Sequence, residues 1–298
     1  MSAATQPVGI VGVGLVGLAL AERAIRAGFP VVGHDVDPAR LTRLAAVGGT
    51  PVESAADVFA TARIVLFALL EQWQTESVIN AALPTLAAGT TLIDCGTGDP
   101  ARMPALAAHV AAHGAVLLDA PLSGSSEQIR AGDATMLAGG ERTAYDAAAP
   151  LLDAITRTRF HLGDAGSGTR AKLATNLLLG LNRAALAEAL AFAESLGLDT
   201  SSFLDLLRAT PAYSRAVDAK GQRMVERNYG EPESRVRQHR KDLRLIDAAA
   251  ERAGCPLPLT RVHAAALDAA IEAGFGDADN AAIVETWRLA RRAGPTTP

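Results

Sequence analysis

Several features are scarce in this 298-residue sequence, and each scarcity excludes a class of protein. Only two cysteines occur, Cys95 and Cys255, which are too few for a disulfide framework and fit a reducing cytoplasm. Acidic residues (32) outnumber basic residues (28), and the resulting net charge of −4 does not suit a protein that tracks nucleic acid. No apolar run reaches the ~18 residues of a membrane span. We therefore expect a cytoplasmic protein without nucleic-acid or membrane partners.

What the sequence does contain is enough apolar material for a sizeable core. Hydrophobic residues make up 49% of the chain and charged residues 20%, a balance that excludes wholesale disorder. The apolar stretch 8–20 contains four glycines and has no basic segment before it, so we expect no targeting signal. The length favours two domains.

The first half alternates short apolar runs with alanine-rich segments, which is typical of a doubly wound α/β domain with a parallel sheet. Strands are expected at 8–13, 30–34, 64–67, 90–93 and 115–118, with 135–138 and 159–162 completing the same sheet. Helices are expected at 15–27 and 38–46. A further helix is expected to start from an Asp99 N-cap with Pro100 in its first position and to run to His113.

Strand patterns disappear beyond Gly163, and the rest of the chain is predicted to be helical. The expected helices span 169–196, 201–210, 212–227, 233–253, 259–273 and 278–293. We therefore predict a dinucleotide-binding domain over residues 1–163. An all-α substrate and dimerisation domain is predicted over 164–298, beginning with a long interdomain helix.

A G-x-G-x-x-G sequence at Gly12, Gly14 and Gly17 lies between an expected strand and an expected helix. In this context the first glycine permits a tight turn and the second lets the backbone approach a pyrophosphate. The third lets the helix pack on the strand. The motif predicts a Rossmann domain in which Leu15 and Val16 open the helix that faces the phosphates. A glycine cluster that only packs the helix is the alternative.

Asp35 follows the second expected strand, eighteen residues after Gly17. An acid at this place accepts hydrogen bonds from the adenosine ribose hydroxyls, and the charges of Asp35 and Asp37 would repel a 2′-phosphate. We therefore expect NAD to be preferred to NADP. Arg40 and Arg43 offset this preference in part, and a solvated turn residue is the alternative for Asp35.

Three further motifs occur in the order Asp119-Ala120-Pro121-Leu122-Ser123-Gly124-Ser125, then Gly166-Ser167-Gly168-Thr169-Arg170-Ala171-Lys172 with Asn176, and finally Lys241-Asp242-Leu243. With the glycine-rich turn, they resemble the β-hydroxyacid dehydrogenase family, the group of 3-hydroxyisobutyrate dehydrogenase and tartronate-semialdehyde reductase. The resemblance covers residues 8–243, and the chain length agrees with it. Ser125 replaces a glycine of the family, and Ser234 stands where the family often has an apolar or aromatic residue.

The resemblance implies that Lys172 is the general acid/base in hydride transfer between NAD(H) and a small β-hydroxy acid or its semialdehyde. Proton exchange near neutral pH needs a pKa below the lysine reference of ~10.4. A position near the start of a long helix and apolar neighbours such as Leu173 both disfavour the ammonium. Asn176 lies one turn further on the same helix face, where it can hold the substrate or orient the amine. The alternative for Lys172 is an aliphatic stem packed on the core with its ammonium in water.

The resemblance also implies which residues bind the carboxylate of the substrate. Ser123 and Gly124 follow Pro121 at the end of a strand, where a hydroxyl and unhindered N–H groups suit an anion. Lys241 is implied as an active-site residue from the second domain that contacts substrate and cofactor. The alternatives are a capping turn for residues 123–124 and a solvated basic helix face for Lys241.

Three residues are implied to line the cofactor beside the glycine-rich turn. Thr97 corresponds to a threonine near the nicotinamide half, and Leu69 and Leu70 stand where the family has Leu-Pro. Leu70 in place of proline, and Gly96 in place of serine, are departures at this edge. An ordinary helix cap is the alternative for Thr97.

The sequence favours an NAD-dependent oxidoreductase that acts as a homodimer or homotetramer on a small carboxylate-bearing substrate. An imine reductase shares the architecture but usually replaces the lysine, and a non-catalytic nucleotide-binding protein of the same fold is a third possibility. The six histidines show no metal-ligand spacing, so no metal is expected.

Overall fold

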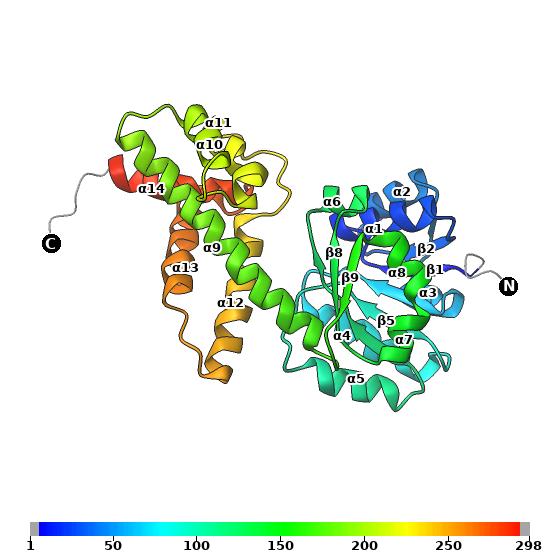
Figure 1. The fold of residues 1–298 in the computed structure, drawn as a ribbon. Helices are drawn as coiled ribbons and strands as arrows, with labels where there is room; N and C mark the ends of the chain where they lie inside the picture. Colours follow the sequence, from blue (N-terminus) through cyan, green and yellow to red (C-terminus); the bar gives the residue numbers. More distant parts are fainter. Residues whose placement is uncertain (1–5, 293–298) are drawn as a thin grey trace. The chain divides into compact units, whose positions relative to one another are not determined.

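The computed structural model describes residues 6–292 (Figure 1). Residues up to Lys172 form one compact unit, and residues from Leu173 onwards form another. The helix α9 (Ser167–Ser195) begins in the first unit and continues in the second. No helix in the described part of the chain is both long enough and apolar enough to span a membrane.

The first unit is built on a parallel six-stranded sheet with the order β3-β2-β1-β4-β5-β6. Its strands are β1 (Val8–Val11), β2 (Val31–His34), β3 (Thr50–Pro51), β4 (Ile64–Phe67), β5 (Thr91–Asp94) and β6 (Val116–Asp119). The central strands are almost wholly buried, as expected where helices cover both faces of a parallel sheet. The strand order reverses between β1 and β4, where doubly wound sheets bind ligands beyond the strand ends. The expected α/β class is confirmed.

Helices cover both faces of this sheet (Figure 1). One face packs against α3 (Ala55–Thr61), α4 (Gln72–Ala82) and α5 (Met103–Ala111). The other face packs against α1 (Leu15–Arg26), α2 (Pro38–Ala46), α6 (Ser126–Ala131), α7 (Arg142–Ala147) and α8 (Ala149–Ile155). Of these helices, the predictions by residue range covered only α1, α2 and α5.

The strands at 135–138 and 159–162 were expected in the main sheet, and this expectation was wrong. The structure places β7 (Leu122–Ser123), β8 (Thr135–Ala138) and β9 (Thr158–His161) in a separate three-stranded sheet. The chain runs on from β6 into β7 and reverses only through α6, so β7 pairs antiparallel with β8. An isolated bridge between Asp119 and Gly139 joins the last residue of β6 to the residue that follows β8.

The helix expected from Asp99 starts later, at Met103, with Arg102 as its N-cap residue. Asp99 instead closes a short turn, because its Oδ1 accepts a hydrogen bond from the backbone N–H of Ala101 at 3.0 Å. The proline of the first helical turn is therefore Pro104 rather than Pro100. The first expected strand also ends sooner, at Val11, because the turn begins at Gly12.

The second unit is built of helices joined by loops over residues 173–292, as expected. Besides α9 it contains α10 (Thr200–Arg208), α11 (Gln222–Glu226), α12 (Val236–Ala253), α13 (Pro258–Ala270) and α14 (Val284–Arg292). The helix expected at 212–227 begins only at 217, as the π-helix η3 (Val217–Gly221). A second π-helix, η4 (Ile271–Phe275), follows α13, and the 3₁₀ turn η5 (Asn280–Ile283) precedes α14.

The core of the second unit lies between α9, α12 and α13. Leu190, Leu243 and Leu267 of these three helices are fully buried there. The last residue of the expected helix 278–293 lies outside the described residues.

Candidate active site

The glycine-rich turn connects β1 to α1, and each glycine answers a different steric demand. Gly12 has a φ of +89°, and a Cβ there would lie 2.7 Å from the carbonyl oxygen of Ala68. A Cβ at Gly17 would come within 1.9 Å of the Gly12 oxygen. The space beside Gly14 is open, since the nearest atom from a distant described residue to a Cβ built there is an Arg40 nitrogen at 3.7 Å. This arrangement fits a pyrophosphate approaching the backbone.

The start of α1 is ready to receive an anion. Gly14 is the N-cap residue and offers no side-chain acceptor to the first turn, which opens with Leu15 and Val16. Uncapped N–H groups at a helix N-terminus attract phosphate groups. The residues of the turn therefore fit the dinucleotide predicted for them.

Asp35 follows β2 and is 6% exposed, so it is not a solvated turn residue. Its Oδ2 accepts a hydrogen bond from the Val13 N–H at 2.7 Å, and its Oδ1 accepts one from the Asp37 N–H at 3.0 Å. Arg40 Nη1 lies 3.2 Å from Oδ2. Asp35 thus joins the glycine-rich turn to the first turn of α2.

The loops after β4 and β5 lie next to each other, because Gln72 holds them together. Its Oε1 accepts a hydrogen bond from the Asp99 N–H at 2.5 Å. Leu69 packs beside Gly12, whereas Leu70 is 60% exposed. Thr97 is half-buried and does not cap α5, which excludes the helix-cap alternative.

The loop after β6 carries the predicted carboxylate site. Ser123 pairs with Thr135 in the small sheet, and the exposed Gly124 has a φ of +154°. The capping residue of α6 is Ser125, whose hydroxyl accepts a hydrogen bond from the Gln128 N–H at 3.3 Å. Because Ser125 makes the cap, the capping alternative does not account for Ser123 and Gly124.

A buried carboxylate joins this loop to the start of α9. Asp119, at the end of β6, is 1% exposed. Its oxygens accept hydrogen bonds from the N–H groups of Gly166 and Thr169, both at 2.7 Å, and from the Thr169 hydroxyl at 2.9 Å. Burial raises the pKa of Asp119, and these hydrogen bonds oppose the rise. Sequence reasoning quoted Asp119 in its motif without giving it a role.

Two glycines let the start of α9 approach the main chain at the ends of β6 and β8. A Cβ at Gly168 would lie 2.2 Å from the Leu137 oxygen and 2.5 Å from the Asp119 oxygen. A Cβ at Gly139 would lie 2.9 Å from the Gly168 nitrogen. No side chain fits at either place, so backbone packing fixes the beginning of α9.

Lys172 is the sixth residue of α9 and is 9% exposed. It therefore lies in the second turn, beyond the turn where the helix dipole is strongest. Asp119 accepts a hydrogen bond from the Thr169 N–H in this first turn, and its carboxylate lies against the positive end of the helix.

In the second unit, Asn176 lies beside the third motif. It is 7% exposed, and its Nδ2 donates a hydrogen bond to Asp242 Oδ2 at 3.3 Å. Lys241 precedes Asp242 on α12 and is half-buried. Arg183, two turns beyond Asn176 on α9, is 6% exposed, and burial lowers its pKa to about 10. Sequence reasoning missed Arg183, although an arginine within the Ala/Leu-rich middle of α9 was a signal.

Two histidines pack together near Arg183. The ring centroids of His239 and His263 lie 5.0 Å apart, and both residues are buried. Gly180 makes room for them, because a Cβ there would lie 2.6 Å from His239 Nε2. Within residues 6–292, no group of three or more His, Cys, Asp or Glu side chains is arranged to hold a metal ion.

The first unit therefore collects most of the predicted residues at one edge of its sheet. The loops that carry Asp35, Gly12, Leu69, Thr97 and the Ser123 motif follow β2, β1, β4, β5 and β6, which are neighbours in that order. Parallel strands end at the same edge, so these loops share it. Asn176 and Lys241 lie in the second unit.

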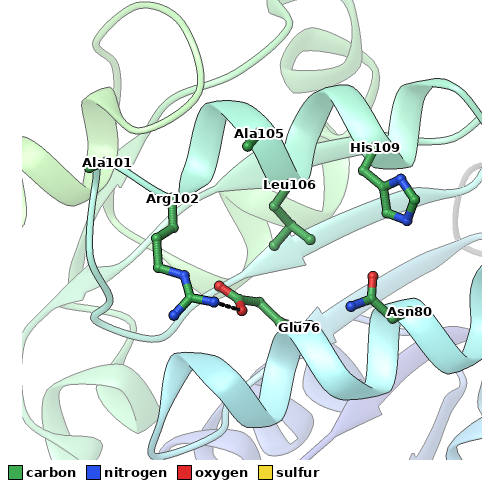
Figure 2. A pocket seen from close by; sticks show the side chains of 7 residues that line it. All are labelled: Glu76, Asn80, Ala101, Arg102, Ala105, Leu106 and His109. Carbon is green, nitrogen blue, oxygen red and sulfur yellow. Dashed lines mark hydrogen bonds and ion pairs between the residues drawn. The ribbon is translucent and has the colours of Figure 1, made fainter.

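A separate pocket of about 460 Å³ lies between α4 and α5, and Figure 2 shows its lining. Glu76 and Arg102 form an ion pair at one side, and His109 lies on the same helix as Leu106. None of the predicted site residues lines it. Ala101 and Arg102, at the far end of the loop after β5, are its contact with the strand-end loops.

Two sequence families match the chain. The family described as the NAD binding domain of 6-phosphogluconate dehydrogenase matches residues 7–163. The family described as NAD-binding of NADP-dependent 3-hydroxyisobutyrate dehydrogenase matches residues 166–287. Together they span nearly all of the described residues.

Named proteins are similar over the same length. L-threonate dehydrogenase of Cupriavidus necator is 32% identical over 94% of this chain and 95% of its own length. The 2-(hydroxymethyl)glutarate dehydrogenase of Eubacterium barkeri is 28% identical over 94% of both chains. The crystal structure of 3-hydroxyisobutyrate dehydrogenase from Salmonella typhimurium has a TM-score of 0.87 at 28% identity, covering 94% of this chain and 99% of that one.

Proposed function

The chain belongs to the 3-hydroxyisobutyrate dehydrogenase-like family of β-hydroxyacid dehydrogenases, and on this premise we propose that it interconverts a small β-hydroxy acid and its semialdehyde with NAD(H). The observation that carries the proposal is the placement of Lys172. Its side chain is buried on a helix whose start is bound to the end of β6. Ligands of doubly wound sheets bind beyond the carboxyl ends of the strands. Lys172 lies on a helix that is attached to this edge of the sheet through Asp119.

The proposed role of Lys172 is to exchange a proton with the substrate oxygen. Oxidation of the alcohol carbon releases a hydride, which the nicotinamide accepts when it is bound, and a proton from the hydroxyl. A neutral Lys172 amine takes that proton, and the ammonium returns it when the carbonyl is reduced. Burial supports this role, because a desolvated amine gives up its proton more readily than one in water.

The carboxylate of the substrate is assigned to Ser123 and Gly124. A hydroxyl and backbone N–H groups bind an anion without bringing another full charge into the site. The exposed Gly124 leaves the backbone accessible. Asn176 and Lys241 are also assigned to substrate binding, and Lys241 to the cofactor as well. These assignments follow from the family resemblance of their motifs.

Residues 1–163 are assigned to cofactor binding, through Gly12, Gly14, Leu15, Val16, Gly17, Asp35, Leu69, Leu70 and Thr97. NAD is the proposed cofactor, because the buried acid Asp35 ends β2 and Val36 follows it in place of a cation. Residues 164–298 are assigned to substrate binding and dimerisation. Exposed leucines on α9, such as Leu178 and Leu179, support a homodimer or homotetramer. A cytoplasmic location completes the proposal.

The proposal is tested by following NADH absorbance with a panel of hydroxy acids. The panel comprises 3-hydroxyisobutyrate, glycerate, L-threonate, 2-(hydroxymethyl)glutarate, 4-hydroxybutyrate and simple β-hydroxy acids. We expect turnover with at least one of them. Cyclic imines with NADPH, measured in the same plate, test the imine reductase alternative. Turnover of imines alone would overturn the proposed reaction.

Two variants test the residue assignment. Lys172→Ala should lower kcat by about 10²–10⁴-fold while the Kd of NADH stays nearly unchanged. Lys172→Arg keeps a positive charge but cannot release a proton near neutral pH, so it should be as slow as the alanine variant. Comparable turnover in either variant would remove the acid/base role from Lys172.

A further inference from the structure

The carboxylate of Asp35 has no acceptor position left for a ligand. A carboxylate offers about four lone-pair positions. The Val13 N–H and the Asp37 N–H take one on each oxygen, at 2.7 and 3.0 Å. Arg40 Nη1 lies 3.2 Å from Oδ2 and 3.4 Å from Oδ1. A ribose hydroxyl can therefore reach this carboxylate only if one of these partners leaves.

Arg40 is the partner that is able to leave. The two N–H groups belong to the turn after β1 and to the N-cap residue of α2, so the fold fixes both of them. The Arg40 side chain is 45% exposed, so its guanidinium reaches water when it leaves the buried carboxylate. Its guanidinium can swing on a flexible stem without disturbing the helix.

The Arg40 guanidinium lies between the carboxylate of Asp35 and the glycine-rich turn. Its Nη1 lies 3.7 Å from the position of a Cβ on Gly14, the glycine that leaves room for a pyrophosphate. Its Nε lies 3.4 Å from Asp37 Oδ2, so two carboxylates surround the guanidinium. Arg43, one turn further along α2, is exposed, and no described hydrogen bond or ion pair joins it to either carboxylate.

We propose that Arg40 is a movable counter-ion that sets the cofactor selectivity of this chain. It yields Asp35 to ribose hydroxyls when the cofactor is NAD(H), and it turns to the 2′-phosphate when the cofactor is NADP(H). Arginine binds phosphate through two parallel hydrogen bonds, which replace the hydrogen bonds that Arg40 gives up at Asp35. The inference rests on the proposed function, and it implies that both cofactors bind, with Arg40 supplying most of the affinity for NADPH.

The test measures the Kd of NADH and of NADPH by isothermal titration calorimetry, for the wild type, Arg40→Ala and Arg43→Ala. Arg40→Ala should raise the Kd of NADPH about tenfold or more, and should leave the Kd of NADH unchanged or lower. Arg43→Ala is the matched control, because it removes the same charge from the same helix without touching Asp35. It should leave both constants within about twofold.

Arg40→Lys refines the result and covers the case in which the alanine variant fails to fold. Lysine keeps the charge but loses the bidentate geometry, so it should bind NADPH less tightly than the wild type. Equal changes for both cofactors in Arg40→Ala, or equal effects of Arg40→Ala and Arg43→Ala, would overturn the inference. If the wild type binds neither cofactor, the proposed function itself is wrong.

Discussion

Asp119 holds Thr169 through two hydrogen bonds, one from its backbone N–H at 2.7 Å and one from its hydroxyl at 2.9 Å. The carboxylate is contributed by the end of a strand, and the threonine belongs to the first turn of α9. Lys172 follows Thr169 by three residues, close to one helical turn. A motif expected to bind substrate thus also sets the position of the proposed acid/base.

Replacing Asp119 by Asn should therefore lower kcat without weakening cofactor binding. The amide keeps the size of the carboxylate but presents N–H groups to donors, so the start of α9 should shift. A shift of about 1 Å at a reacting group can cost up to ~10²-fold in rate. We expect a loss of about 10–100-fold in kcat, with the Kd of NADH unchanged, from steady-state kinetics and calorimetry.

Asp199→Asn is the control for this experiment. Asp199 caps α10 by accepting hydrogen bonds from the Ser202 N–H at 2.8 Å and the Ser202 hydroxyl at 2.7 Å. It makes the same kind of contact without reaching the start of α9. The control variant should retain the wild-type kcat. An equal loss of kcat in both variants would contradict a specific role for Asp119.

Asp35→Ala should weaken the binding of NADH more than that of NADPH. Alanine removes the buried carboxylate that follows β2, and with it the acceptor for ribose hydroxyls and one of the two charges that repel a 2′-phosphate. A loss of about tenfold in NADH affinity is expected, measured as Kd by calorimetry. A wild-type protein that already prefers NADPH would contradict this argument for NAD.

The stability of the protein should fall on mild acidification because of His263. Burial, with the positive charges of Arg183 and Arg240, lowers the pKa of His263 to about 4. His239 packs against its ring and adds no compensating negative charge. The unfolded chain holds this proton more tightly, so the free energy of unfolding is greatest above pH ~6.5 and declines as pH falls toward ~4.

The size of this effect is on the order of 3 kcal/mol for a fully shifted histidine. The free energy of unfolding is measured with urea for the wild type and His263→Gln, at about pH 7.5 and pH 5. The difference between the two proteins isolates the contribution of His263, because other effects of acid act on both of them. The glutamine variant should lose less stability on acidification. The exposed His109 provides the control, and His109→Gln should follow the wild type. Parallel pH profiles for all three proteins would contradict the assignment.

The two thiols should react at very different rates with an aromatic disulfide reagent. Cys255 is exposed, whereas Cys95 is buried at the end of β5, and burial raises the pKa of its thiol. Only the thiolate reacts, so the native protein should show one rapid equivalent and the denatured protein two. The Cys255→Ser variant should show no rapid equivalent in the native state. Two rapid equivalents from the native wild type would contradict the burial of Cys95.

The features that sequence predicted well are those encoded by neighbouring residues. The apolar runs of β1 and β4 appear within two residues of their expected bounds at either end. The glycine-rich turn forms where its spacing indicated, because the positive φ of Gly12 and the contact of Gly17 with the Gly12 oxygen are set within a few residues. Local patterns of this kind are sufficient for a fold class.

The features that sequence missed depend on contacts between distant parts of the chain. The bonds of Asp119 reach 47 and 50 residues along the chain, and no periodicity marks such a pair. The separate small sheet depends on the reversal between β7 and β8 and on the pairing of β8 with β9, which lie more than twenty residues apart. The cap at Ser125 is different, because it is encoded locally: Ser125 and Gln128 have the Ser-x-x-Gln spacing of a capping box.

The close approach of Gly139 and Gly168 limits how this protein can change its substrate. Even a methyl group at either position would collide with the main chain, so neither can vary without moving a strand end. Laboratory evolution toward new hydroxy acids must therefore leave both glycines in place. The start of α9, which carries Lys172, is therefore constrained by backbone packing, and substrate range must change through side chains elsewhere in the site.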